Sequence, residues 1–300
     1  MKMSVRLAGL EFASPVLAAS GTWEFGLRFA DVSNQLGGIV TKGITLEPRA
    51  GNPPPRIAEC PGGIINSVGL ENPGLATFVG HFLPRIGRLR CRVIVNVAGS
   101  RPGEYAELVE RLAHPRVDAF ELNVSCPNVR EGGTAFGASP AAVERITRLC
   151  RRRTKKPLIV KLTANFVDPA ETARAAEAGG ADAVTVLNTL FGLALGPEGR
   201  PFLGGRTGGV SGPCLKPFAL YCVDRVAPAI GIPVVACGGV MNGADAADFL
   251  SAGARLVQVG SASLADPQAP GRVARELATF CRARRLRDWD DLVGRTRREN

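Results

Sequence analysis

Histidine is nearly absent from this chain, which has only His81 and His114 among its 300 residues. A histidine-based catalytic triad or a multi-histidine metal site therefore has almost nothing to draw on. The eight cysteines form no CxxC pair, and several lie in apolar runs where a free thiol behaves as a small hydrophobe. We expect neither a disulfide framework nor a metal site here, so acid–base chemistry must come from other side chains.

Long apolar stretches are also missing. No segment approaches the roughly 20 uninterrupted apolar residues that a membrane helix needs. The first residues, MKMSVRLAGLEFASPV, carry charges where a signal peptide would be apolar. These features predict a cytoplasmic protein that does not associate with a membrane.

Acidic residues are outnumbered by basic ones, 27 to 37, which gives a net charge of +10 and an isoelectric point near 9.6. Such a charge suits a polyanionic partner, so nucleic acid has to be considered. The arginines are scattered, however, and the dense runs at 151–156 and 282–298 match no nucleic-acid-binding motif. Solvated helix faces explain the charge better. Lysine is scarce, so a lysine at a strand end would be there for its compact, tunable ammonium group.

Short runs of β-branched and apolar residues recur along the chain, most of them continuously apolar and not alternating. This pattern is typical of parallel strands buried on both faces. The eight predicted strands are 15–19, 38–44, 92–97, 119–125, 158–162, 183–187, 233–237 and 256–260.

Helical patterns lie between these runs. Tyr105, Leu108, Val109 and Leu112 follow the spacing of one helix face. Three pairs of a capping residue and a proline predict helix starts, at Ser139-Pro140, Asp168-Pro169 and Asp266-Pro267.

Eight strands alternating with helices, with no linker between them, predict an α/β fold in which residues 1–300 form a single (β/α)8 TIM barrel domain. A doubly wound sheet is the main competitor, but no GxGxxG follows the first strand. The segment 4–16 predicts a short N-terminal β-hairpin turning at Ala8-Gly9. Two connections, 47–73 and 126–139, are long enough to hold more than a turn, and the one after strand four is a candidate lid loop.

In a barrel, the residues that end each strand meet at one site, and here they are unusually polar. Asparagines and lysines converging with one cysteine, and with no carboxylate, predict a cavity for an anionic ligand rich in hydrogen-bonding groups. Glycine pairs after strands seven and eight favour a phosphate-bearing cofactor held by backbone N–H groups. The strand-end residues are Ser20, Lys42, Asn96, Asn123, Ser125, Cys126, Lys161, Asn188, Thr189, Gly238, Gly239, Gly260 and Ser261.

Several motifs, in order along residues 14–265, resemble those of the class 1 dihydroorotate dehydrogenases. They are TKGITLEPRAGNPPPR at 41–56, NSVGLENPG at 66–74, NVAGS at 96–100, ELNVSCPNVREGGTAFG at 121–137, NTLFG at 188–192, TGGVSGPCLKP at 207–217 and CGGV at 237–240. The resemblance implies an FMN-containing barrel that oxidises dihydroorotate to orotate in pyrimidine synthesis, with one FMN per chain.

The run CPNVREGGTAFG after the fourth strand resembles the 1B branch. That branch implies a catalytic subunit that passes electrons to NAD+ through a separate subunit carrying FAD and a [2Fe-2S] cluster. The expected assembly is a homodimeric core within a heterotetramer. Class 2 enzymes carry serine in place of Cys126 and an N-terminal membrane segment, and this chain shows neither feature.

The resemblance also assigns roles to individual residues. Cys126 would be the base that removes the C5 proton of dihydroorotate, work that suits a thiol when nearby donors favour its thiolate. Lys42 would contact both flavin and substrate, and Lys161 would lie beside the flavin edge that becomes anionic on reduction. An unpaired ammonium in apolar surroundings is costly, so an anion should accompany each lysine.

The remaining assignments fall into two groups. The predicted substrate residues, besides Lys42, are Asn66, Ser67, Val68, Gly69, Leu70, Asn123, Asn188 and Thr189. The predicted FMN residues, besides the two lysines, are Ser20, Gly43, Asn96, Asn123, Leu187, Gly212, Gly238, Gly239, Gly260 and Ser261. Trp23 stands where a smaller or different aromatic residue is expected, and it would reshape the dimethylbenzene edge of the flavin.

Three alternatives stay open on the sequence alone. The first is a homodimeric 1A enzyme that uses fumarate, and the second is a related pyrimidine-ring reductase, which would usually differ at Asn128. The third belongs to a different class: a non-catalytic basic barrel that binds phosphorylated ligands or nucleic acid.

Overall fold

A closed barrel of eight parallel strands forms the centre of the computed structural model, which describes residues 4–125 and 136–298. The strands follow the order β10-β13-β14-β3-β4-β7-β8-β9 around the barrel. All eight predicted strands are confirmed. They are β3 (Val16–Ala18), β4 (Gly38–Val40), β7 (Arg92–Val97), β8 (Ala119–Asn123), β9 (Leu158–Lys161), β10 (Ala183–Val186), β13 (Val234–Cys237) and β14 (Ala254–Val259).

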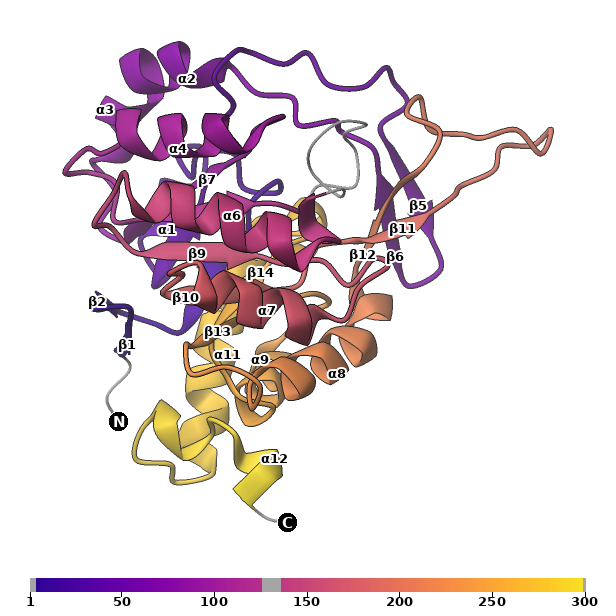
Figure 1. The fold of residues 1–300 in the computed structure, drawn as a ribbon. Helices are drawn as coiled ribbons and strands as arrows, with labels where there is room; N and C mark the ends of the chain where they lie inside the picture. Colours follow the sequence, from indigo (N-terminus) through magenta and orange to yellow (C-terminus); the bar gives the residue numbers. More distant parts are fainter. Residues whose placement is uncertain (1–3, 126–135, 299–300) are drawn as a thin grey trace.

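Helices cover the outside of the barrel (Figure 1). The longer ones are α4 (Pro102–Arg111), α6 (Pro140–Arg151), α7 (Pro169–Ala178), α8 (Lys216–Val226), α9 (Gly243–Ser251) and α11 (Ala269–Ala283). Short helical segments are α1 (Ala30–Ser33), α2 (Gly74–Thr77), the π-helical η1 (Phe78–Phe82), α3 (Leu83–Ile86), the 3₁₀ turns η2 (Pro213–Leu215) and η3 (Trp289–Asp291), α10 (Ala262–Ala265) and α12 (Arg295–Arg298).

Helix starts follow the predicted chemistry at two of the three sites. The side chains of Ser139 and Asp168 accept hydrogen bonds from the backbone N–H groups of Ala142 and Ala170, which caps α6 and α7. The third prediction was wrong, because Asp266 follows α10 and α11 begins only at Ala269. The carboxylate of Asp266 instead accepts from the backbone N–H of Gln268 and closes a turn between the two helices.

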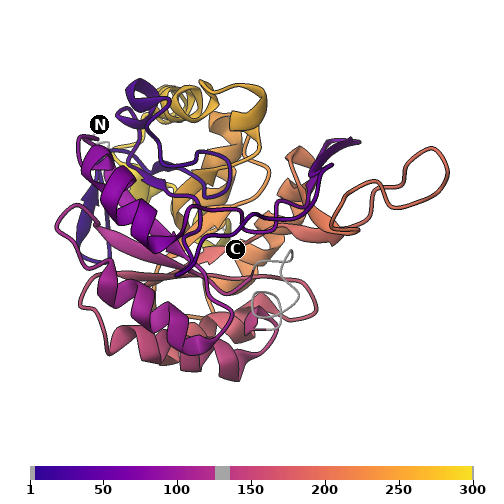
Figure 2. The same ribbon diagram turned by 90° about the horizontal axis from the view of Figure 1, so that it is seen from above.

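The predicted N-terminal hairpin is present as β1 (Val5–Leu7) and β2 (Leu10–Phe12), which pair antiparallel. Val5, Leu7 and Phe12 belong to the continuous hydrophobic core. The hairpin lies on the opposite side of the barrel from a second, four-stranded sheet (Figures 1 and 2). Within the described ranges, no helix is long and apolar enough to cross a membrane.

The four-stranded sheet is built by two of the strand-to-helix connections. Its order is β11-β12-β6-β5, from β5 (Ile57–Cys60), β6 (Gly63–Asn66), β11 (Leu190–Gly192) and β12 (Gly208–Ser211). Strands β5 and β6 follow β4 in the chain, and strands β11 and β12 follow β10. The four-stranded sheet therefore stands at the carboxyl ends of the barrel strands. The segment between β11 and β12 projects away from the barrel as an arm (Figure 2).

Candidate functional site

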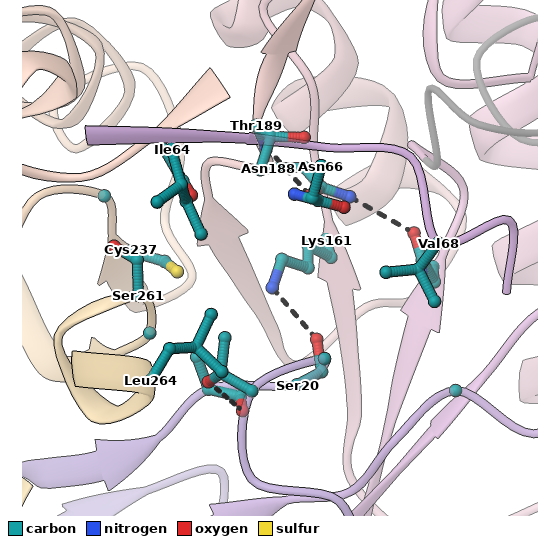
Figure 3. Close-up of a pocket in the computed structure, with 18 of the residues that line it drawn as sticks. Ser20, Ile64, Asn66, Val68, Lys161, Asn188, Thr189, Cys237, Ser261 and Leu264 are labelled. Atoms are coloured by element: carbon teal, nitrogen blue, oxygen red, sulfur yellow. Dashed lines mark hydrogen bonds between the residues drawn. The ribbon is translucent and has the colours of Figure 1, made fainter. Parts of the chain in front are cut away.

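A cavity of about 230 Å³ opens at the carboxyl end of the barrel, between the strand ends and β6. Figure 3 shows Lys161 at its centre, with Asn66, Asn188 and Thr189 along one side and Ser20 opposite. The structure brings most of the predicted site residues to this cavity. Those that line it are Ser20, Lys42, Gly43, Asn66, Val68, Gly69, Leu70, Asn96, Asn123, Lys161, Leu187, Asn188, Thr189, Gly238, Gly239, Gly260 and Ser261.

Two of the described residues that were assigned to substrate or FMN do not line the cavity. The hydroxyl of Ser67 accepts a 2.9 Å hydrogen bond from Nδ2 of Asn52, so this buried side chain faces the long loop. Gly212 packs against the neighbouring hairpin, where an added Cβ atom would lie 2.5 Å from Cα of Gly63. Both residues support the wall of the site from behind.

Cys126 and residues 127–135 of the predicted lid loop lie outside the described residues. The chain enters that segment beside the cavity. Nδ2 of Asn188 donates a 3.0 Å hydrogen bond to Oγ of Ser125 and lies 3.5 Å from Oδ1 of Asn123. The residue before Cys126 is therefore held against two asparagines that line the cavity.

The expectation that the cavity holds no carboxylate was wrong. Glu71 lines it, with Oε1 placed 3.6 Å from Nζ of Lys42, while its other oxygen pairs with Arg56 at 2.8 Å. Below the floor, Oε1 of Glu121 lies 3.8 Å from Nζ of Lys161. An anionic side chain thus accompanies each lysine, as the cost of burying an ammonium group requires.

Asn96 brings an unused acceptor to the cavity. Its side chain is buried, and no donor in residues 4–125 or 136–298 reaches Oδ1. A Cβ atom at Gly43 would lie only 2.8 Å from this oxygen, so glycine at position 43 keeps it open to the cavity. A buried acceptor without a partner is costly, which indicates that a bound N–H or O–H group satisfies it.

One end of the cavity is formed by backbone. Gly238 and Gly239 have φ angles of +137° and +77°, a region that other residues rarely adopt. A Cβ atom at Gly239 would lie 2.6 Å from the backbone nitrogen of Lys216. Together with Gly260 and Ser261, this end has the small residues and exposed backbone that suit a phosphate group.

Cys237 also reaches the cavity, although its sequence context predicts a small buried hydrophobe. Burial raises the pKa of the Cys237 thiol, the nearby Lys161 ammonium lowers it, and Glu121 raises it. The net direction is upward, which favours the protonated thiol and suits a residue that forms part of the cavity wall.

Other lining residues escaped the sequence analysis. Ile57 and Ile64 come from the hairpin of β5 and β6, whose short sequences IAEC and GIIN show no regular alternation that would have predicted these strands. The remaining ones are Ala19, Gly21, Thr22, Glu71, Ser211, Leu215, Val240 and Leu264. Trp23 is absent from this wall, because its indole is buried and donates a 2.9 Å hydrogen bond to Oγ of Ser33.

The arrangement suits a large planar ligand with a phosphate tail, together with a second, smaller anion. The lysines supply positive charge, and the asparagines supply paired donors and acceptors at the centre. The glycine end would suit the phosphate, and the apolar hairpin residues would cover the rings of such a ligand.

Comparison with known proteins agrees with this geometry. A family model described as Dihydroorotate dehydrogenase matches residues 2–281. A protein of Pelobacter propionicus, named the catalytic subunit of dihydroorotate dehydrogenase B (NAD(+)), is 45% identical over 296 residues, which are 97% of each chain. The protein of the same name from Lachnoclostridium phytofermentans is 44% identical over 98% of this chain and 99% of its own.

A solved structure shares the fold. The dihydroorotate dehydrogenase of Eimeria tenella, in complex with ferulenol, superposes with a TM-score of 0.83 at 24% identity. The match covers 99% of this chain and 89% of that one.

Proposed function

The chain belongs to the dihydroorotate dehydrogenase family, and we propose that it is the catalytic subunit of an NAD+-linked enzyme that oxidises dihydroorotate to orotate on one bound FMN. The relatives that it matches over nearly their whole length carry that name, and the family uses a flavin. The observation that carries the proposal is the buried Oδ1 of Asn96, which has no hydrogen-bond partner among the described residues and belongs to the same cavity as Lys161 and the glycine-lined end.

The residues present fit FMN. Oδ1 of Asn96 would accept an N–H of the flavin ring, and Lys161 would face the edge where negative charge collects on reduction. Gly238, Gly239, Gly260 and Ser261 would hold the phosphate. When bound, FMN supplies the hydride acceptor for the reaction.

The substrate would lie above the flavin, against Asn66, Asn123, Asn188 and Thr189. Lys42 would hold its carboxylate by a charge-assisted contact. The apolar side chains of the β5–β6 hairpin would exclude water. Cys126 would take the C5 proton, and Ser125, fixed by Asn188, would hold the start of its segment at the substrate.

The flavin assignment can be tested on the purified chain. We expect a yellow protein that releases FMN on denaturation and whose visible flavin absorbance is bleached by dihydroorotate without oxygen. A colourless protein that binds nucleic acid or phosphorylated ligands would support the non-catalytic barrel. Reduction by a dihydropyrimidine lacking the carboxylate, but not by dihydroorotate, would support a ring reductase.

We also propose that electrons leave through a separate subunit with FAD and a [2Fe-2S] cluster, because the relatives are named as catalytic subunits. Leu264, at the rim of the cavity, is 48% exposed and offers that subunit apolar surface. The isolated chain should reduce dyes but not NAD+, and co-expression with a cognate iron–sulfur flavoprotein should confer NAD+ reduction. Rapid fumarate reduction by the isolated chain would instead favour the 1A type.

Replacement Leu264→Glu tests the docking surface. We expect loss of NAD+ reduction in the complex with dye reduction and FMN content kept. Val79→Glu, at an exposed apolar position on η1, is the matched control. Loss of FMN in Leu264→Glu would show that the residue serves the flavin and not the partner.

A homodimeric core is the remaining part of the proposal. Exposed apolar side chains gather on the arm between β11 and β12 and beside it, at Leu193, Leu195, Phe202 and Phe166. The rings of Phe166 and Phe191 contact each other in a tilted arrangement, with centroids 5.6 Å apart. Exposed apolar side chains gathered in this way favour an association site. Leu195→Asp should therefore produce monomers in sedimentation experiments, whereas an unchanged dimer would exclude the arm.

The described cysteines are free thiols, which is typical of a reducing compartment. We propose the cytoplasm on that basis.

A further inference from the structure

A fully buried carboxylate lies under the floor of the cavity and has no role in the proposed chemistry. Glu121, in β8, has no solvent exposure. Its Oε1 accepts a 2.8 Å hydrogen bond from Nδ2 of Asn96, and its Oε2 accepts bonds of 2.8 Å from Oγ1 of Thr185 and from Nε2 of Gln258. Donors from three other strands thus converge on this one side chain.

Three groups donate to this carboxyl group, and the Lys161 ammonium lies 3.8 Å from its Oε1. A carboxylate accepts hydrogen bonds and gives none, so these donors and the ammonium suit its charged form. The barrel therefore places an acidic side chain directly behind the lysine of the site.

The contact with Asn96 also sets how that amide faces the cavity. Because Nδ2 donates to Glu121, the acceptor Oδ1 is the atom left for a ligand. Glu121 has a second link to the site through Lys161, whose Nζ lies 3.2 Å from Oγ of Ser20 at the cavity wall.

We propose that Glu121 is a positioning residue that orients Asn96 and offsets the charge of Lys161, and thereby lowers the reduction potential of the flavin. The inference rests on the proposed function. Reduced flavin carries more negative charge than oxidised flavin, so a fixed anion nearby disfavours reduction. In a buried site such an interaction is weakly screened. A lowered potential suits a flavin whose electrons must pass onward to a nicotinamide acceptor.

The test compares the midpoint potential of bound FMN in variants with opposite expected shifts. Glu121→Gln removes the charge with little change in volume, and we expect a more positive potential. The oxidised-to-reduced ratio at a fixed potential should change at least tenfold, which is about 30 mV for a two-electron couple. Glu110→Gln, on the exposed face of α4, is the control and should leave the potential unchanged.

Thr185→Val keeps the charge of Glu121 and removes one of its donors, so the carboxylate is less neutralised and the potential should fall. This variant decides the question alone if Glu121→Gln does not fold. A purely structural role for Glu121 predicts lower stability in both variants with no shift in potential. Wild-type potentials in both, or shifts of the same sign, would overturn the inference. A wild-type chain that holds no flavin would overturn the proposed function instead.

Discussion

Nζ of Lys42 lies 3.6 Å from Oε1 of Glu71 at the wall of the cavity, and Glu71 is held in turn by Arg56. The lysine proposed to bind the substrate carboxylate therefore already has an anionic neighbour. Glu71 is 44% exposed at its side chain, so solvent weakens but does not abolish its effect.

Glu71→Gln should tighten the binding of orotate because it removes a charge that competes for Lys42. Pairs this exposed are worth about 0.2–1 kcal/mol, so the gain should be at most about fivefold. Orotate titrations followed by the flavin spectrum, at low and high salt, would measure it. Glu59→Gln, on the exposed face of β5, is the control. Weaker binding in Glu71→Gln would show that Glu71 holds Lys42 in place.

Replacing Lys161 and replacing Lys42 should affect different ligands. Lys161→Ala should weaken FMN retention or lower the reduction potential of the flavin, since it removes the cation behind the ring. Lys42→Ala should chiefly weaken orotate binding. A charge-assisted contact of this kind is worth about 1.5–3 kcal/mol. Unchanged flavin content, potential and orotate affinity in both variants would exclude these roles.

Cys126→Ala should keep FMN and bind orotate, yet lose about 10² to 10⁴ in the rate of flavin reduction by dihydroorotate, because general-base catalysis is worth that much. Stopped-flow reduction without oxygen would measure the rate. Cys126→Ser should recover part of it at raised pH. The exposed thiol of Cys214 provides the control variant Cys214→Ala. A rate of flavin reduction in Cys126→Ala within twofold of the wild-type rate would show that Cys126 is not the base.

Gly239→Ala should release the cofactor. Its φ of +77° and the 2.6 Å approach of an added Cβ atom to the backbone of Lys216 leave no room for the methyl group. The strand end must then move, and the phosphate cradle with it. FMN content after desalting would show the loss. Gly199→Ala, on the projecting arm with a φ of +70° and open space around it, controls for backbone strain alone. Equal FMN content in the two variants would show that Gly239 does not help to hold the FMN phosphate.

Asp168 gives a pH dependence with a definite sign. The backbone N–H of Ala170 lowers the pKa of this carboxyl, burial raises it, and Arg225 lowers it further, with a net downward shift. A lowered pKa contributes stability above the unfolded value of about 3.9, and this is lost as pH falls through the folded pKa. Urea unfolding of wild type and Asp168→Asn should therefore differ most near neutral pH and converge in acid. A difference in the free energy of unfolding that stays the same at every pH would contradict this assignment.

The barrel was predictable because its strands are buried on both faces, which leaves a continuous apolar signal that helices with clear caps interrupt. Strand ends such as Asn96 and Lys161 stood out as polar residues closing those runs. The helix start predicted at Asp266 was wrong because a capping side chain followed by proline occurs in turns as well as at helix starts. The sequence alone does not distinguish the two.

The two carboxylates of the site were missed for different reasons. Glu121 lies two residues before Asn123 and therefore on the same face of β8, so strand alternation offered a signal. Glu71 follows Leu70, which adopts a positive φ of 56° in a long loop, and no pattern in the sequence predicts where such a loop turns. Ser67 and Trp23 point away from the cavity because of hydrogen bonds to partners 15 and 10 residues distant along the chain.

The pairing of β14 with β3 joins Val257 to Val16, so the barrel closes between segments at opposite ends of the chain. During synthesis on the ribosome, the first seven strands emerge before the strand that completes them. An incomplete barrel has two open parallel edges, which attract other chains. Contacts so distant in sequence also form slowly. The nascent protein is thus most exposed to aggregation just before β14 leaves the exit tunnel, and chaperones that shield unpaired strands should raise its yield most at that stage.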